Sequence, residues 1–137
     1  MEAVYYNLVR VSFELGTWDE ADRFYQEALP LVKLNPDREA SRFDYLKGRL
    51  LASGDQPDFE NAFLLFEKSV QADQASGALV QAAQTKYYLA QMLAQEGEIE
   101  RSSKILKEIK DMFGNWEIPF WQKKCEQALD TINKRKV

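Results

Sequence analysis

Apolar residues recur every three or four positions along most of this chain, in segments separated by short polar turns. The first such segment covers residues 2–15, and its regularly spaced positions are Tyr5, Leu8, Val9, Val11, Ser12 and Leu15. This 3.6-residue period predicts an amphipathic helix that packs one stripe against a core. Gly16 is expected to end the helix, because glycine readily takes the positive φ found at helix ends.

A second helix is predicted from about Trp18, with Thr17 or Asp19 as its cap. The apolar period continues through Ala21, Phe24, Tyr25, Ala28 and Leu29. Pro30 is expected to bend or end this helix, since proline lacks the amide hydrogen that a helix interior needs. Residues 2–35 therefore predict one helical hairpin.

The same arrangement recurs twice downstream. Helical periods are predicted over about 38–53, 59–75, 78–96 and 99–113, with Asp55 or Asp58 capping the second of these and Gly97 closing the third. A seventh helix, about 119–134, has one apolar face formed by Trp121, Cys125, Ala128, Leu129 and Ile132. The chain thus predicts a single all-α domain over 1–137, with hairpins at about 2–35, 38–75 and 78–113 and a capping helix at its end.

Composition and charge narrow the range of partners. The net charge is −4, and the one dense basic cluster is the terminal Lys134-Arg135-Lys136, so no nucleic-acid partner is expected. No run approaches the roughly 18 apolar residues that span a bilayer, so no membrane association is expected. The single cysteine, Cys125, cannot form an internal disulfide, and a cytoplasmic location is the expectation.

The residues needed for catalysis are missing from the sequence. There is no histidine, which is the most common general base and metal ligand. Cys125 has no histidine to activate it and lies on an apolar helix face, so we expect a buried core residue. No glycine-rich phosphate loop occurs, and the acidic clusters at turns are expected to cap helices. We therefore expect no enzyme activity, no cofactor and no metal site.

The hairpin pattern resembles the tetratricopeptide repeat, a helix-turn-helix unit of about 34 residues. The first repeat carries the resemblance at Tyr5, Leu8, Gly16, Trp18, Ala21, Tyr25 and Ala28. The second carries it at Phe43, Leu46, Gly54, Phe59, Ala62 and Phe66, with Ser69 at the second small position. The third carries it at Leu89, Ala90, Gly97, Ser102 and Leu106, but has Lys86 and Ile109 at family positions that usually hold an aromatic residue and an alanine. The repeats of this chain recur with a period of roughly 40 residues, which is longer than the family's period of about 34.

The resemblance implies a right-handed α-α superhelix whose concave face, built by the first helix of each hairpin, binds a peptide or a partner domain. Carried over by repeat position, that partner-binding face comprises Tyr6, Arg10, Phe13, Asp44, Lys47, Leu51, Gln84, Tyr87 and Gln91. We expect Tyr6 and Tyr87 to point away from the core into this groove. The family subset that grips a terminal carboxylate uses a lysine and asparagines, and Tyr6 and Arg10 stand at two of those places. That specialised function is not expected here.

An alternative function stays open beside peptide binding. Long, degenerate repeats of this kind also resemble regulatory segments of bacterial transcription activators, signalling ATPases and cyclases. The chain would then be a self-associating scaffold or a regulatory segment of a larger bacterial signalling or transcription protein. Because Glu2 already begins the first repeat, we expect the outer face of the first hairpin to be uncovered, and a homodimer through that N-terminal hairpin is the corresponding expectation.

Overall fold

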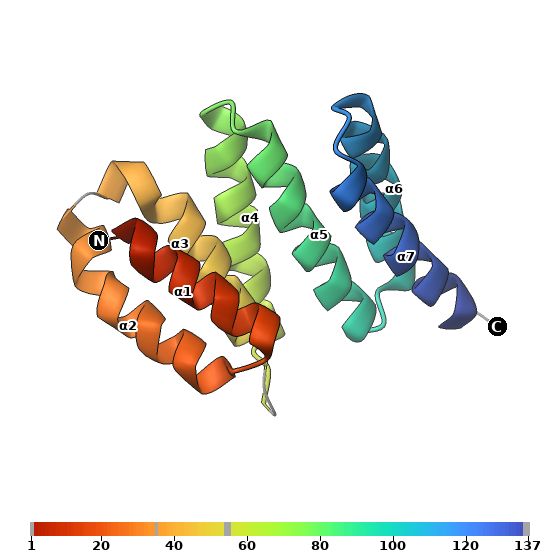
Figure 1. Ribbon diagram of the computed structural model, residues 1–137. Coiled ribbons are helices and arrows are strands. Elements are labelled where there is room, and N and C mark those ends of the chain that lie inside the picture. The colour runs from red at the N-terminus through yellow and green to blue at the C-terminus, as the bar shows by residue number, and fades with distance from the viewer. Residues whose placement is uncertain (1, 35, 54–55, 136–137) are drawn as a thin grey trace. The chain divides into compact units, whose positions relative to one another are not determined.

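The computed structural model describes residues 2–34, 36–53 and 56–135, with side chains for residues 7–30, 44–53 and 56–134. Within these residues all regular structure is helical, which confirms the predicted all-α class (Figure 1). The helices are α1 (Glu2–Leu15), α2 (Trp18–Leu34), α3 (Pro36–Leu51), α4 (Phe59–Ala75), α5 (Leu79–Gln95), α6 (Ile99–Asn115) and α7 (Pro119–Arg135). The chain forms two compact units, Met1–Ala72 and Asp73–Val137.

The later helices repeat with a constant length and spacing. Helices α4, α5, α6 and α7 each contain 17 residues, and they begin at Phe59, Leu79, Ile99 and Pro119. Successive starts are therefore equally spaced, because each helix is followed by a turn of the same length. Two such helices with their turns make up the long repeat period seen in the sequence.

Four of the turns between helices share one backbone geometry. After α1, the Gly16 amide donates to the Phe13 carbonyl (3.1 Å) and the Thr17 amide donates to the Ser12 carbonyl (2.9 Å). The same pair of bonds occurs after α4, α5 and α6. The residue that turns the chain has positive φ in each case: Gly16 (72°), Gly77 (83°), Gly97 (89°) and Glu117 (59°). This arrangement pairs carbonyls that a helix end would otherwise leave unbonded.

The first unit packs α1, α2 and α3 around one apolar core. Its buried members are Val9, Phe13, Ala21, Tyr25, Ala28 and Leu46. Ala21 and Ala28 are fully buried, so short side chains stand where the helices meet. Helices α3 and α4 also approach closely, because a Cβ on Gly48 would lie 2.9 Å from the Phe66 ring.

One prediction for this unit is wrong and another is wrong in part. The first concerns Leu8, Val11 and Leu15, which do not share the buried stripe of α1, since 36%, 53% and 71% of their respective surfaces are exposed. The core covers only the neighbouring arc of that helix, which carries Val9, Ser12 and Phe13. Tyr5 lies outside the described side chains.

The second is the prediction that Pro30 bends or ends α2, of which the end is contradicted and the bend stays a prediction. The helix continues to Leu34, because a proline removes one backbone hydrogen bond and the residues after it still complete a helical turn. The Asp58 cap of α4 is confirmed, since its Oδ1 accepts a hydrogen bond from the Asn61 amide (3.2 Å). Asp55, the other candidate cap, lies outside the described residues.

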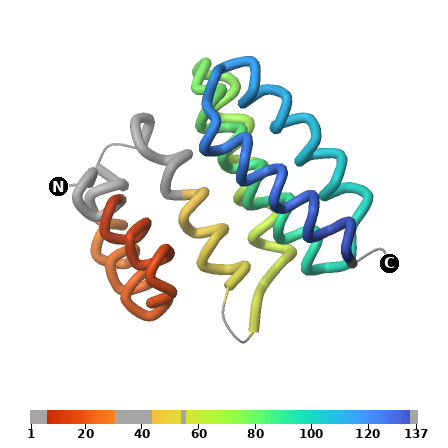
Figure 2. The backbone as a smooth tube through the Cα atoms, turned by 45° about the vertical axis from the view of Figure 1, so that its right-hand side comes forward, coloured from red at the N-terminus to blue at the C-terminus, as the bar shows by residue number. Residues whose placement is uncertain are grey.

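The second unit packs α5, α6 and α7 side by side (Figure 2). Its core includes Leu106, Ile109 and Phe113 of α6, all fully buried. The Ser102 hydroxyl donates a buried hydrogen bond to the Ala90 carbonyl (2.6 Å), which ties α6 to α5. The predicted apolar face of α7 is confirmed, because Cys125, Leu129 and Ile132 are buried and Trp121 and Ala128 are half-buried.

Candidate functional site

Helices α5 and α7 lie against each other in the second unit and run in the same direction. Near the start of the contact, the Tyr87 ring meets the Trp121 ring at a centroid distance of 5.5 Å. Further along, residues 91–95 of α5 face residues 128–132 of α7 across a shared pocket. Later residues of one helix therefore meet later residues of the other. We call the contact formed by residues 87–95 and 120–132 the α5–α7 seam.

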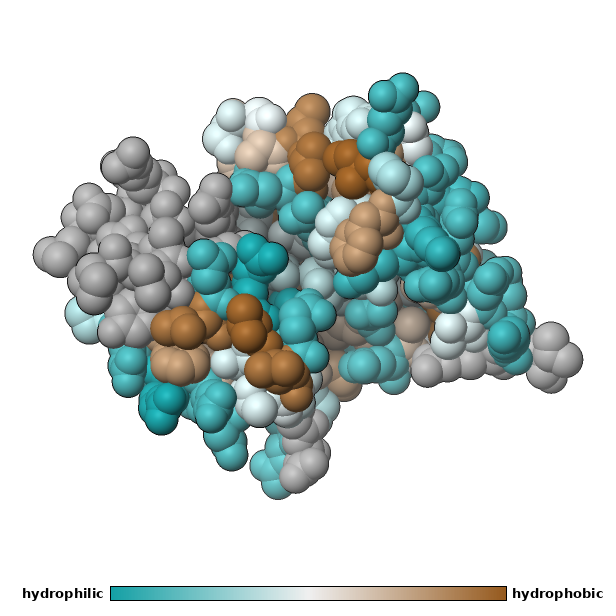
Figure 3. Space-filling view, viewed as in Figure 1, coloured by the Kyte–Doolittle hydropathy of each residue, from teal (hydrophilic) through white to brown (hydrophobic). Residues whose placement is uncertain are grey.

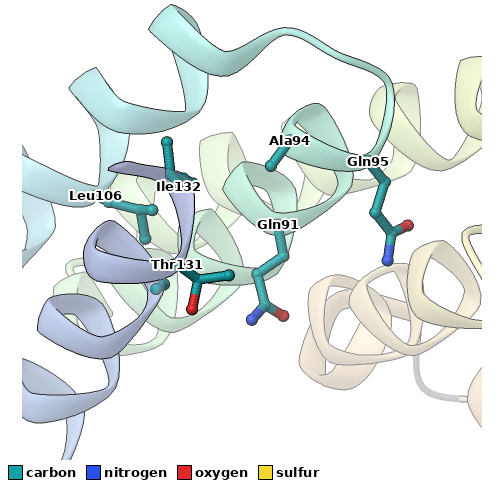
Figure 4. Close-up of a pocket in the computed structure, with 7 residues that line it drawn as sticks. Gln91, Ala94, Gln95, Leu106, Thr131 and Ile132 are labelled. Carbon is teal, nitrogen blue, oxygen red and sulfur yellow. The ribbon is translucent and has the colours of Figure 1, made fainter. Parts of the chain in front are cut away.

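The seam contains a pocket of about 190 Å³ (Figure 4). It is lined by Gln91, Ala94, Gln95, Leu106, Ala128, Thr131 and Ile132. Two of these residues, Ala94 and Ala128, are too small to fill the space between the helices. None of the lining residues carries a charge. The volume lies below the roughly 300–1,000 Å³ of typical cofactor and ligand pockets, so the pocket is sized for one side chain.

Polar groups stand at one side of this pocket and aliphatic groups at the other. The Gln91 amide and the Thr131 hydroxyl point to the same side, away from Leu106 and Ile132 (Figure 4). The Gln91 Nε2 donates to the Tyr87 hydroxyl (2.8 Å), which orients its amide, and the Thr131 hydroxyl donates to the Gln127 carbonyl (3.0 Å). A glutamine amide has two donor hydrogens and an acceptor oxygen, so Gln91 has further bonding capacity. The site can hold an apolar side chain of a ligand while Gln91 forms hydrogen bonds with polar groups of the same ligand.

An aromatic cluster occupies the other end of the seam. The Trp121 ring stacks on Phe113 (5.8 Å) and meets the edges of Tyr88 (6.1 Å) and Phe120 (5.9 Å). Lys124 joins these rings: its Nζ lies 4.9 Å from the Trp121 centroid, 5.2 Å from Phe120 and 5.7 Å from Tyr87. Ring faces attract a cation electrostatically. The cluster therefore holds one ammonium group beside an uncharged pocket.

Among the predicted partner-binding residues of the second unit, Gln91 lines the pocket and Gln84 is half-buried on α5. The expectation that Tyr87 points away from the core is wrong. Only 7% of its surface is exposed, and it packs in the core of the second unit. The reason is α7, whose Trp121 covers the Tyr87 ring, whereas the sequence reading assigned that helix only a capping role.

In the first unit, Phe13 is likewise in the core and not in a groove. Its ring is 5% exposed, contacts the Trp18 ring (5.3 Å) and is covered by the Arg49 guanidinium (4.3 Å). Arg10 is exposed, whereas Leu51 is half-buried. Tyr6 is not among the residues whose side chains the structure describes.

The two charged predictions on α3 are already engaged. Asp44 is half-buried and its carboxylate lies 3.5 Å from Lys68 Nζ of α4. Burial raises the pKa of Asp44 although the Lys68 charge and hydrogen bond act in the opposite direction. The Lys47 ammonium lies 5.3 Å from the Tyr25 ring. Phe13 and Tyr87 belong to the cores of their units, and a groove shared by the other seven predicted residues stays a prediction.

The sequence reading missed Gln95, Thr131 and Lys124. The signal for the pocket was present as the facing alanines Ala94 and Ala128, since small residues leave room between helices. An alanine on the apolar face of a helix indicates close packing as readily as a pocket, so this signal alone does not locate the site. The proximity of Lys124 to a ring on α5 has no sequence signal, because it depends on how two helices separated by the whole of α6 are placed.

Three further features of the described residues bear on function: the cysteine thiol, the metal-ligand side chains and the length of the helices. Cys125 is fully buried, and burial raises the pKa of its thiol to about 11. Within residues 2–34, 36–53 and 56–135, no three histidine, cysteine or acidic side chains gather as metal ligands would. The helices described are also all too short or too polar to cross a bilayer.

Comparison of the chain with protein families, with curated proteins and with solved structures found no match. The tetratricopeptide resemblance therefore depends on the sequence pattern alone.

Proposed function

We propose that this chain is a non-enzymatic protein-interaction module that binds an extended peptide segment of a partner in the α5–α7 seam. In this proposal the whole chain is one tetratricopeptide-like domain, with three hairpins and a capping helix arranged as a superhelix. The observation that carries the proposal is the uncharged pocket of about 190 Å³ between two parallel helices, with amide and hydroxyl groups along one side.

The spacing of the polar groups suits an extended peptide. Gln91 and Gln95 are four residues apart on α5, which separates their backbone positions by about 6 Å along the helix axis. In an extended chain, every second residue presents its peptide group to the same side, at intervals of about 6.6 Å. Each glutamine can donate to and accept from one such group. An aliphatic side chain of the same peptide would enter the space left by Ala94 and Ala128.

The repeated geometry supports the superhelical arrangement. From α4 onward each helix has 17 residues and the helices start at equal intervals. The turns after α1, α4, α5 and α6 form the same pair of backbone hydrogen bonds. Equal helices joined by equal turns are the units from which stacked repeat proteins are built, and such stacks present extended binding surfaces.

The experiment selects a phage-displayed random heptapeptide library on the immobilised chain and measures the affinity of the leading peptide by fluorescence anisotropy. Thr131→Trp places a large ring at the pocket, and we expect it to weaken binding at least about tenfold, since filling a pocket removes the contacts of the bound side chain. The matched control is Asn133→Trp, an equally bulky change at an exposed position of α7 outside the pocket. No enrichment of peptides, or equal affinity of both variants, would refute the proposal.

A second candidate function, self-association, is favoured by the apolar surface of α1. Leu8, Val11 and Leu15 form an exposed ridge with Trp18 at the start of α2, of which 38% is exposed. Apolar atoms gather over α1 in the space-filling view (Figure 3). A stable interface buries about 800 Å² on each partner, more than four partly exposed side chains supply. A dimer through this ridge would therefore be weak and concentration-dependent.

Sedimentation velocity over a range of concentrations separates this candidate from the first. If the α1 ridge mediates self-association, the sedimentation coefficient rises with concentration, and the double substitution Val11→Lys and Leu15→Lys abolishes the rise. Leu64→Lys and Leu79→Lys is the matched control, since both leucines are exposed elsewhere, at 59% and 48%. A concentration-independent monomer would reject self-association and leave the peptide proposal unaffected.

A further inference from the structure

We infer that the α5–α7 seam selects an extended peptide with an aliphatic residue and an acidic residue two positions apart. The aliphatic side chain enters the pocket and the acidic side chain pairs with Lys124. This inference rests on the proposed peptide binding and adds the chemistry of the ligand.

The charge distribution along the seam indicates one acidic group in the ligand. The seven residues that line the pocket are all uncharged, so the ligand part that enters it must be neutral. One turn earlier on α7 stands Lys124, whose ammonium group is held by rings of Tyr87, Phe120 and Trp121. Within the part of the chain that the structure describes, no carboxylate forms an ion pair with this ammonium. A ligand carboxylate can therefore pair with it without displacing another acid.

The distance between the two subsites sets the spacing in the ligand. Lys124 precedes Ala128 by four residues, which corresponds to about 6 Å along the axis of α7. In an extended peptide, residues i and i+2 point to the same side and are separated by about 6.6 Å. Adjacent residues point to opposite sides, so they could not reach both subsites. The geometry therefore requires one intervening residue.

The aromatic cluster prepares Lys124 for this role. A free lysine side chain loses considerable rotamer entropy when it is fixed in an ion pair. Here Lys124 is half-buried among three rings, so part of that freedom is already lost before a ligand arrives. Phe120 is 64% exposed and leaves the cluster open on one side. An acidic group can thus approach the ammonium from solvent.

The test uses the random heptapeptide library selected on the full chain, followed by affinity measurements on synthetic versions of the leading peptide. We expect enrichment of sequences with leucine, isoleucine or valine two positions from aspartate or glutamate. Lys124→Glu should weaken binding about five- to tenfold, because the charge reversal replaces the attraction of a partly exposed charge pair with a repulsion. Lys123→Glu is the matched control, because it makes the same charge change at an exposed neighbouring position.

A charge-reversed peptide guards against a simple loss of structure. When the acidic residue of the leading peptide is replaced by lysine, its affinity should fall for the wild-type chain and recover on Lys124→Glu. If Thr131→Trp abolishes peptide binding but Lys124→Glu leaves the affinity unchanged, this inference is overturned and the proposed function stands. If Thr131→Trp leaves the affinity unchanged, or if no peptide is enriched, both this inference and the proposed function are overturned.

Discussion

Gly48 of α3 lies directly against the Phe66 ring of α4, so closely that a Cβ at position 48 would be 2.9 Å from Cε1 and 3.0 Å from Cδ1 of that ring. Phe66 is 1% exposed, so the ring has little room to move away. The absence of a side chain at Gly48 is what permits this approach between the two helices.

Gly48→Ala should destabilise the protein by about 1 kcal/mol, because overpacking costs about 1–3 kcal/mol and exceeds the helix-propensity gain of about 1 kcal/mol. Urea unfolding followed by circular dichroism measures the change. Gly114→Ala is the control: its Cβ would meet the flexible amide end of Gln122, at 3.0 Å from Nε2, and that side chain can turn aside. Equal stability changes for the two variants would contradict the packing at Gly48.

Glu117→Gly should stabilise the protein by about 0.5–1 kcal/mol, because Glu117 has a φ of 59° that is costly for residues with a side chain. The equivalent turn residue after α5 is Gly97, with a φ of 89°. Gly97→Ala should accordingly lower stability by about 1 kcal/mol. Urea midpoints of the two variants measure both effects, and a destabilised Glu117→Gly would show that the side chain makes a compensating contact.

The Cys125 thiol should resist alkylation by iodoacetamide in the native protein and react fast in urea, since it is fully buried. Its pKa is raised from 9.0 to about 11, so the unfolded chain releases the thiol proton at lower pH than the folded chain. The contribution of Cys125 to stability is therefore present below pH 9 and is lost between pH 9 and pH 11. Unfolding of Cys125→Ala over this range should show a shallower fall in stability. An equally steep fall would exclude Cys125 as the cause.

Asp44→Asn should leave stability equal or increased at neutral pH. Burial raises the pKa of Asp44 above 3.8, so the folded state disfavours the carboxylate despite the Lys68 ion pair. Stability from this group is therefore present below pH 3.8 and lost as the pH rises through the folded-state pKa. The stability difference between Asp44→Asn and wild type should shrink on acidification below pH 3.8. A clear loss of stability in Asp44→Asn at neutral pH would mean that the ion pair dominates.

The helices could be predicted from the sequence because each depends on local periodicity and end signals. Gly16 takes positive φ as predicted, Gly97 lies just after the end of α5, and Asp58 caps α4. The orientation of side chains on those helices could not be predicted as well, because it depends on which neighbours cover which arc. Phe13 and Leu15 show this: the sequence assigned Phe13 to a groove and Leu15 to the core, and the structure buries the first and exposes the second.

The sequence predicted two residues of the candidate site, Gln91 and Tyr87, and it was wrong about the orientation of the Tyr87 ring. The other components of the site, among them Thr131 and Lys124, become neighbours of α5 only through the placement of α7, which no local pattern encodes. Glu117 shows the same limit at a turn, since its place in the repeated turn geometry is visible only beside Gly16, Gly77 and Gly97.

Chemical-shift mapping of the leading library peptide on the ¹⁵N-labelled chain tests the central proposal most directly. We predict that the largest amide shifts fall on α5 and α7 around Gln91, Gln95 and Thr131, with smaller shifts near Lys124. Shifts concentrated on the α1 ridge, or spread evenly over the chain, would contradict peptide binding in the α5–α7 seam.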